Sequence, residues 1–249
     1  MTRPLSLVVI TRNEEKDLPG CLKSAADLAA EIIVVDNNSQ DRTVEIARSF
    51  GAKVISRVFD DYTSQKNFAL SHASQEWVLH LDADERLTHE LRNEIAELFR
   101  KGWPKANGYE IPYSVVFMGR TLRHAGTGTE RHLRLLRKSM ARFSGGAVHE
   151  KLVVTGETQR LSGRIIHIPY TDMGEYLKKL DIYTLLAARK AFGAGRKYHP
   201  LKLLILPLEF LKRYLLRLGF LDGVPGFIWC TLASFYVWLK VVRLREITR

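Results

Sequence analysis

Three apolar runs, each followed by polar or acidic residues, most constrain how this chain can fold. They cover residues 5–10, 31–36 and 77–82 and consist largely of Val, Ile and Leu. Short continuous runs of this kind predict strands that are buried on both faces. Helical patterns separate the runs, and strands that alternate with helices of about a dozen residues form right-handed βαβ units. We therefore expect an α/β fold built around a mostly parallel sheet.

The pattern changes after a charged helix that is expected over residues 89–101. Strands are then predicted over residues 109–118 and 132–136, with glycine-rich loops around them. Because no helices separate these strands, the segment predicts a mixed extension of the sheet.

The last third of the chain is predicted to be helical. From Asp172 onward three helical segments are separated by glycines near residues 193–195 and 219–226. This change of character predicts two regions, residues 1–171 and a basic amphipathic helical region over residues 172–249.

Two carboxylates, Asp82 and Asp84, follow the third apolar run one residue apart. In an extended chain, residues i and i+2 point to the same side, so both can converge at the carboxyl end of a strand. Open α/β sheets bind ligands at that edge, and paired carboxylates suit Mg²⁺ or Mn²⁺ bound together with substrate phosphates. The pattern therefore predicts a metal-bound nucleotide, with a helix cap formed by the Asp82–Glu85 segment as the structural alternative.

Positive charge is concentrated near the C-terminus. The whole chain carries a net charge of +11, and residues 176–249 hold 14 lysines and arginines against four acidic residues. This asymmetry indicates an anionic partner. No nucleic-acid-binding motif is present, and the basic residues lie among large apolar ones, so we expect an anionic membrane surface and no nucleic acid.

Two amphipathic or apolar segments favour this membrane interpretation. Over residues 201–218 the charged side chains fall on one arc of a helix, and residues 224–239 contain no charge at all. Apolar faces with aromatic residues and flanking bases are typical of helices in a membrane interface. Core helices of the catalytic part or of a dimer, and a true membrane span, remain as alternatives; the sequence leaves the oligomeric state unknown.

Cysteine use and the N-terminus bear on the compartment. Cys21 and Cys230 are the two cysteines and have neither disulfide nor zinc spacing, which is typical of a reducing compartment. The first apolar run is too short for a signal-peptide core. We therefore expect a cytoplasmic protein that lies peripherally on the inner face of the cytoplasmic membrane.

Four ordered motifs carry a resemblance to a known family. They occupy residues 7–15, 34–43, 65–70 and 82–85, and together they resemble family-2 glycosyltransferases. Two later motifs, Gly-Gly-Ala-Val-His-Glu and Gly-Phe-Leu-Asp-Gly, are similar to those of bacterial lipopolysaccharide-core β-glucosyltransferases. The resemblance implies an A-type glycosyltransferase fold, with a Rossmann-like mostly parallel sheet, a mixed extension and a C-terminal helical membrane-associating region.

The resemblance also implies a nucleotide-sugar site in residues 1–171, with Asp36 accepting a hydrogen bond from the base. Helix capping is the alternative role for Thr11 and Ser39, and a solvated helix start is the alternative for Lys66. The residues expected to bind the donor are Thr11, Asn13, Glu14, Asp36, Ser39, Gln65, Lys66, Asn67, Asp82 and Ala83.

Catalysis in such an enzyme requires a metal-stabilised leaving group and a base. The resemblance implies that Asp84 binds Mg²⁺ or Mn²⁺ directly, while Asp82 binds ribose or a metal-bound water. It nominates Glu150 as the base of an inverting displacement, for which a surface salt bridge is the alternative. A basic segment that includes Arg134 is expected either to grip an anionic group or to be solvated.

These expectations define an inverting, metal-dependent glycosyltransferase. The expected donor is UDP-glucose, and the expected acceptor is lipopolysaccharide inner core or another lipid-linked glycan. Transfer to polyprenyl phosphate or another envelope glycan remains an alternative. A catalytically inert, membrane-associated nucleotide-sugar-binding module is the alternative from another class.

Overall fold

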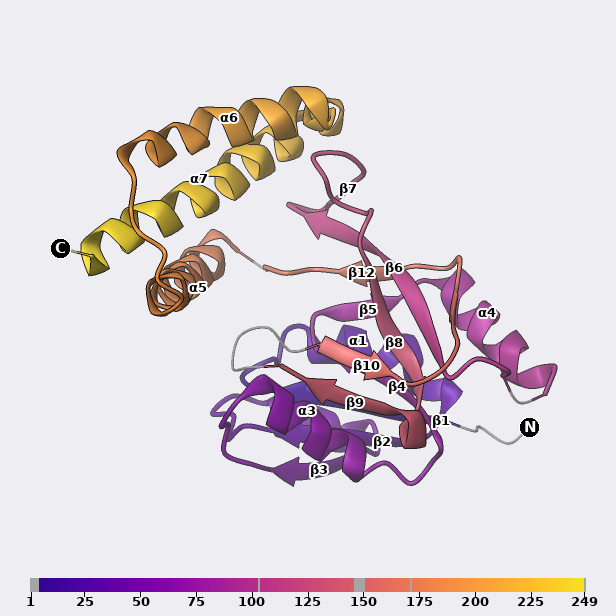
Figure 1. Cartoon of the computed structure of the whole chain (residues 1–249). Helices are drawn as coiled ribbons and strands as arrows, with labels where there is room; N and C mark the ends of the chain where they lie inside the picture. Colours follow the sequence, from indigo (N-terminus) through magenta and orange to yellow (C-terminus); the bar gives the residue numbers. More distant parts are fainter. Residues whose placement is uncertain (1–4, 103, 146–150, 171, 249) are drawn as a thin grey trace. The chain divides into compact units, whose positions relative to one another are not determined.

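The computed structural model describes residues 5–102, 104–145, 151–170 and 172–248. The chain forms two compact units (Figure 1). The first comprises Met1–Tyr113 with Glu130–His167, and the second comprises Ser114–Thr129 with Ile168–Arg249.

Four parallel strands form one side of the sheet in the first unit, in the order β3-β2-β1-β4. They are β1 (Leu5–Thr11), β2 (Ala29–Asp36), β3 (Lys53–Ser56) and β4 (Trp77–Asp82). The intervening helices are α1 (Leu18–Ala25), η1 (Ala26–Leu28), α2 (Thr43–Ser49) and α3 (Tyr62–Ser71). The predicted parallel α/β core is confirmed.

The sheet continues into the predicted mixed extension. β8 pairs antiparallel with both β4 and β6, and β6 pairs parallel with β11. The remaining elements of this part are β5 (Glu85–Leu87), α4 (His89–Arg100), β6 (Gly108–Phe117), β8 (Arg131–Arg137), η2 (Lys138–Met140), β11 (Thr158–Arg160) and β12 (Ile165–His167). A separate hairpin pairs β9 (Ala141–Ser144) with β10 (Lys151–Val154).

Both faces of the parallel sheet are buried. In β1, Leu7 and Val9 belong to one apolar cluster, whereas Val8 between them belongs to a second cluster on the other face. The first cluster includes residues of α1, α2 and α4, and the second includes residues of α3 and β9. This explains why the strands read as continuous apolar runs.

The register of the parallel strands brings their polar ends together. Thr11 is paired with Asp36, and the neighbouring Ile10 is paired with Asp82. The loops that follow β1, β2 and β4 therefore start from one edge of the sheet, which is where α/β folds bind ligands.

The second unit is mostly helical. Its long helices are α5 (Met173–Gly193) and α7 (Gly223–Ile247), and the short hairpin strand β7 (Arg120–Leu122) pairs with the end of β6. Between them lie η3 (Pro200–Leu204), α6 (Ile205–Leu211), the π-helical turn η4 (Lys212–Leu216) and η5 (Gly219–Asp222). The breaks fall at the predicted glycines. Among the described residues, one segment, Gly219–Ile247, is long and apolar enough to cross a membrane.

Candidate active site

The loops after β1 and β2 are joined around the carboxylate of Asp36, which is buried. Its Oδ1 accepts hydrogen bonds from Thr11 Oγ1 at 3.1 Å and Ser39 Oγ at 2.5 Å, and its Oδ2 accepts one from Ser39 N at 2.9 Å. The hydroxyl of Ser39 also accepts a hydrogen bond from Asn13 N at 2.8 Å. Asp36 therefore organises the loop that was predicted to meet the nucleotide base.

A second layer of hydrogen bonds fixes the same loops. Asn13 has a φ of 56° and accepts a hydrogen bond from Gln40 N at 2.8 Å, while Glu14 N donates to Thr43 Oγ1 at 2.7 Å. Asparagine tolerates this left-handed conformation better than most residues. The structure thus brings five predicted donor-site residues together: Thr11, Asn13, Glu14, Asp36 and Ser39.

Helix capping does not explain Thr11 or Ser39. The N-cap positions of α1 and α2 are held by Asp17 and Arg42. Neither helix has a side-chain cap hydrogen bond. Both hydroxyl groups bind the Asp36 carboxylate instead. Their contact with a nucleotide stays a prediction.

The first turns of α3 supply three further predicted residues with different surroundings. Lys66 is buried rather than solvated, and its Nζ lies 3.2 Å from Asp82 Oδ1. Gln65 is also buried, and its Oε1 has no hydrogen-bond partner among the described residues. The amide of Asn67 binds both the N–H and the C=O of Phe143, at 2.8 Å each, and so holds β9 against α3.

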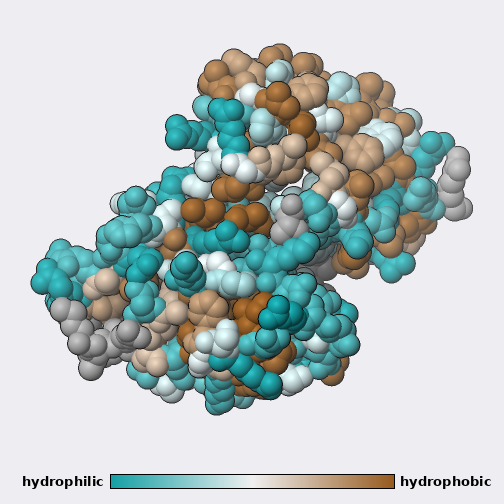
Figure 2. All heavy atoms as spheres, turned by 180° about the vertical axis from the view of Figure 1, so that it is seen from behind, coloured by the Kyte–Doolittle hydropathy of each residue, from teal (hydrophilic) through white to brown (hydrophobic). Residues whose placement is uncertain are grey.

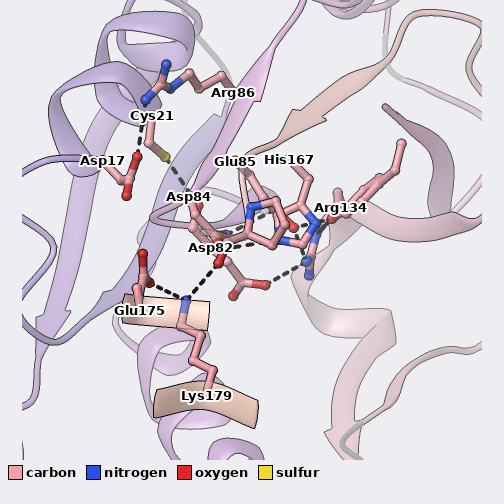
Figure 3. A network of polar contacts seen from close by, with 12 residues as sticks. Asp17, Cys21, Asp82, Asp84, Glu85, Arg86, Arg134, His167, Glu175 and Lys179 are labelled. Carbon is pink, nitrogen blue, oxygen red and sulfur yellow. Dashed lines mark hydrogen bonds and ion pairs between the residues drawn. The ribbon is translucent and has the colours of Figure 1, made fainter. Parts of the chain in front are cut away.

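Arg134 is the centre of a buried polar cluster at the end of β4. Its Nη2 donates to Asp82 Oδ2 at 2.7 Å and to Glu85 Oε1 at 2.6 Å, as Figure 3 shows. Its Nε donates to the hydroxyl of Tyr113 at 2.5 Å, and that hydroxyl in turn donates to Glu85. One guanidinium group therefore holds two neighbouring carboxylates in place, so Arg134 is neither solvated nor free to grip a ligand.

The electrostatics of this cluster differ from residue to residue. Burial alone would raise the pKa of Asp82, but the positive charges of Lys66 and Arg134 outweigh this effect and hold the pKa well below its usual range. Burial raises the pKa of Glu85 despite Arg134. Burial also lowers the pKa of His80 well below its usual value, so this imidazole is neutral at neutral pH. Both oxygens of Asp82 are thus committed to cations of the protein.

Asp84 points to a different partner. Its Oδ2 lies 3.2 Å from Nε2 of His167, the last residue of β12 (Figure 3). Burial alone would lower the pKa of His167, but its hydrogen bond with Asp84 outweighs this and raises it. Both side chains are partly exposed, so a ligand can reach them. The alternative of a helix cap is wrong for Asp82 and Glu85, because β5 intervenes before α4. Thr88 does cap α4, by accepting a hydrogen bond from Leu91 N.

The residues at this edge fit a divalent metal ion only partly. In the described part of the chain no three His, Cys, Asp or Glu side chains form a preformed metal site. Asp84 and His167 do supply a carboxylate and an imidazole side by side. Mg²⁺ is commonly held by one or two carboxylates plus substrate phosphates, and Asp84 offers one such carboxylate with an imidazole beside it.

Glu85 was expected only within a motif and a helix cap, and Tyr113 and His167 were not predicted as site residues. His167 follows only two apolar residues, Ile165 and Ile166, a pattern too short to predict a strand. Ala83 is buried within the first apolar cluster, which gives its predicted donor contact no side-chain support. Glu150, the predicted base, and its neighbour His149 lie outside the described residues.

A mostly parallel α/β sheet with an antiparallel extension, and with carboxylates where its central strands end, defines the A-type class of glycosyltransferase. The comparisons with known proteins agree. Residues 6–158 match the family described as "Glycosyl transferase family 2", which is more than half of the chain, so this protein belongs to that glycosyltransferase family.

Relatives cover nearly the whole chain. An uncharacterized glycosyltransferase of Rickettsia typhi is 30% identical over 99% of this chain and 88% of its own length. The lipopolysaccharide core biosynthesis glycosyltransferase LpsC of Rhizobium meliloti is 29% identical, with 98% and 92% covered. The crystal structure of S. aureus TarS 1-349 with UDP-GlcNAc is similar in fold, with a TM-score of 0.51 and 15% identity over 98% of this chain and 90% of that one.

Proposed function

We propose that this glycosyltransferase moves glucose from UDP-glucose onto the inner core of lipopolysaccharide, with inversion at the anomeric carbon. One observation carries the proposal. The carboxyl ends of β1, β2 and β4 bring the loop organised by Asp36 and the Asp84–His167 pair to the same sheet edge. A base-binding loop beside a diphosphate-binding pair is the arrangement that a nucleotide sugar needs.

The acceptor class is supported by one relative. LpsC is named as a lipopolysaccharide core enzyme, and this chain covers 92% of its length. Because the two chains align over nearly their full lengths, their similarity favours a lipopolysaccharide-core acceptor over a polyprenyl phosphate. The named glucose donor rests on the motif resemblance alone.

Asp84 and His167 are the residues that would hold the metal ion. Magnesium favours an all-oxygen shell, so a nitrogen ligand favours Mn²⁺ over Mg²⁺. When bound, the ion would neutralise charge on the departing diphosphate. Lys66 is a buried cation at the same edge, held by its 3.2 Å contact with Asp82, and its charge would favour a diphosphate bound nearby.

The displacement itself needs a base on the acceptor side. In the proposal the carboxylate of Glu150 removes the proton of the acceptor hydroxyl as that oxygen forms its bond to the anomeric carbon. The bond from the anomeric carbon to the diphosphate breaks at the same time, and the nucleoside diphosphate leaves. A single displacement of this kind inverts the configuration.

We further propose that the protein works at the inner face of the cytoplasmic membrane, where a lipid-linked acceptor is accessible. The second unit supports this, because many of its apolar side chains are exposed and the basic residues of the chain are concentrated there. Residues 1–171 would then carry the chemistry, and residues 172–249 would carry most of the membrane contact.

A thermal-shift screen of nucleotide sugars with and without Mn²⁺ tests the donor assignment. UDP-glucose with Mn²⁺ should raise the melting temperature, since a ligand that binds only the native state stabilises it. Stabilisation by a different nucleotide sugar alone would reject glucose as the donor. A donor that binds while no acceptor is modified would favour the inert binding module.

A further inference from the structure

A bend in the second unit exposes six large apolar side chains. We call it the elbow, residues 212–224, which comprises η4, Leu218, η5 and the first residues of α7. Leu216 is 80% exposed and Val224 is 70% exposed. Figure 2 shows apolar residues gathered over the C-terminal helices. The elbow side chains exposed in this way are Leu215, Leu216, Leu218, Phe220, Leu221 and Val224.

The inner side of the elbow is tightly built, so the exposed leucines are not a sign of poor packing. A Cβ atom at Gly226 would lie 2.2 Å from the carbonyl oxygen of Gly219, and one at Gly219 would lie 2.5 Å from Cys230 Sγ. The carboxylate of Asp222 is buried and accepts hydrogen bonds from the backbone N–H groups of Arg123 and His124. The chain is thus held with its apolar side chains outward.

Basic residues lie within and beside the elbow. The guanidinium of Arg120 lies next to Gly223, and that of Arg217 lies next to Gly126. Within the described part of the chain, the side chains of Arg120, Arg123 and Arg217 make no ion pair. Asp222 is the single acidic residue between positions 210 and 224, and it faces inward.

The neighbouring hairpin adds one more apolar side chain. Met118, in the turn between β6 and β7, is 61% exposed. Arg120 lies in the same hairpin. The hairpin therefore resembles the elbow, because it too has an exposed apolar side chain with a basic residue beside it. Trp229 of α7 packs on Phe117 at 5.3 Å between ring centroids, which joins the hairpin to the helix that follows the elbow.

We propose that the elbow and the Met118 turn insert into the boundary between headgroups and acyl chains of an anionic bilayer. Protruding apolar side chains with arginines beside them match such a surface, because the apolar groups gain from burial and the arginines from anionic headgroups. The proposal rests on the membrane location proposed above and makes it specific. The helices expected over residues 201–218 and 224–239 would then not lie flat in the membrane interface; the bend between them would insert instead.

An environment-sensitive dye tests the insertion in the full chain. Cys21 and Cys230 are both buried, so a dye can be attached selectively to Leu216→Cys and, as a control, to Val58→Cys in the first unit. Val58 is 73% exposed, close to the exposure of the elbow residues. With phosphatidylglycerol-containing vesicles the label at position 216 should shift to the blue, and the label at 58 should not. A label at 216 that stays in water while the protein binds vesicles would overturn the proposal.

Matched substitutions test the energetics. Leu216→Ser with Val224→Ser should lower the vesicle partition coefficient at least tenfold, which corresponds to about 1.4 kcal/mol, whereas Val58→Ser should leave it unchanged. Arg217→Gln should weaken binding to anionic vesicles but not to neutral ones. Equal losses at position 58, or an elbow that forms a dimer in solution and ignores vesicles, would reject the lipid partner.

Donor binding separates this proposal from the proposed function. The elbow variants should keep the thermal shift produced by UDP-glucose and Mn²⁺, because none of these residues belongs to the first unit. If wild-type protein binds vesicles through the elbow but no nucleotide sugar, the proposed function fails and the docking surface stands.

Discussion

Arg134 fixes the geometry of two neighbouring carboxylates, those of Asp82 and Glu85. Asp82 and Glu85 both contact its Nη2, and without that cation two negative charges would face each other in a poorly solvated environment. Leaving one partner of a buried ion pair uncompensated costs about 3–5 kcal/mol. The arginine therefore stabilises the fold and shapes the turn that presents Asp84.

We expect Arg134→Leu to lower the free energy of unfolding by about 3–5 kcal/mol in urea denaturation. The double variant Arg134→Leu with Glu85→Gln should recover part of the loss, because the unpaired charge is gone. Arg160→Lys is the control, since Arg160 pairs with Glu110 at the surface and such pairs contribute little. A change for Arg134→Leu no larger than that of the control would contradict this role.

Asp84 and His167 lead to a prediction about metal binding. Mutating a residue that only hydrogen-bonds to a metal ligand typically lowers metal affinity about 10–100-fold, and mutating the ligand itself should lower it further. Asp84→Ala should therefore abolish the Mn²⁺-dependent part of nucleotide binding, and His167→Gln should weaken Mn²⁺ affinity at least tenfold. Calorimetric titration of Mn²⁺ with UDP present measures both. Unaltered Mn²⁺ affinity in both variants would place the ion elsewhere.

At the scale of elements, Glu31 in β2 joins the sheet to the turn before β4. Its Oε1 accepts hydrogen bonds from Ser6 Oγ at 2.5 Å and from Ser74 N and Oγ at 2.5 and 2.7 Å. Burial alone would raise the pKa of Glu31, but these hydrogen bonds outweigh it and lower the pKa. A lowered folded-state pKa means that the ionised form stabilises the protein.

The stabilisation by Glu31 should therefore be present at neutral pH and fade as the pH falls below about 4.3, the ordinary glutamate pKa. Glu31→Gln should cost about 1–2 kcal/mol at pH 7. The difference from wild type should shrink towards pH 3 in urea denaturation followed by circular dichroism. A difference that stays constant with pH would show that the charge is irrelevant.

The close approach of η5 and α7 gives a second prediction at this scale. Gly226→Ala would place Cβ 2.2 Å from a backbone oxygen, so it should lower stability by about 1–3 kcal/mol or more. Gly193→Ala is the matched control, because nothing lies within 4 Å of its Cβ position and a helix end gains slightly from alanine. Thermal unfolding of the two variants compares them directly, and equal melting temperatures would refute the close contact.

The core strands could be predicted from sequence because both faces of each are buried. Residues 7–10 and 32–35 therefore read as continuous apolar runs. The three-residue strands β5 and β12 could not, since they carry too little pattern and depend on pairing between Glu85 and His167, which are distant in sequence. The capping interpretation of residues 82–85 failed for the same reason.

At the scale of the whole molecule, charge asymmetry was visible in the sequence but the assembly of the second unit was not. Residues 114–129 join the C-terminal helices because Asp222 accepts hydrogen bonds from the backbone N–H groups of Arg123 and His124. Such contacts between segments about a hundred residues apart leave no periodic pattern. The motif residues Asp36 and Asp84 were found because each ends or directly follows a buried strand.

The most direct test is transfer of one hexose from a nucleotide sugar to purified lipopolysaccharide inner core, followed by mass spectrometry. Wild-type protein with UDP-glucose and Mn²⁺ should add a single hexose. Glu150→Gln should keep the donor-induced thermal shift yet lose about 10²–10⁴-fold in rate, because only the base is removed. Normal transfer by Glu150→Gln would contradict the assigned base, and no transfer by wild type from any nucleotide sugar to this acceptor would contradict the proposed function.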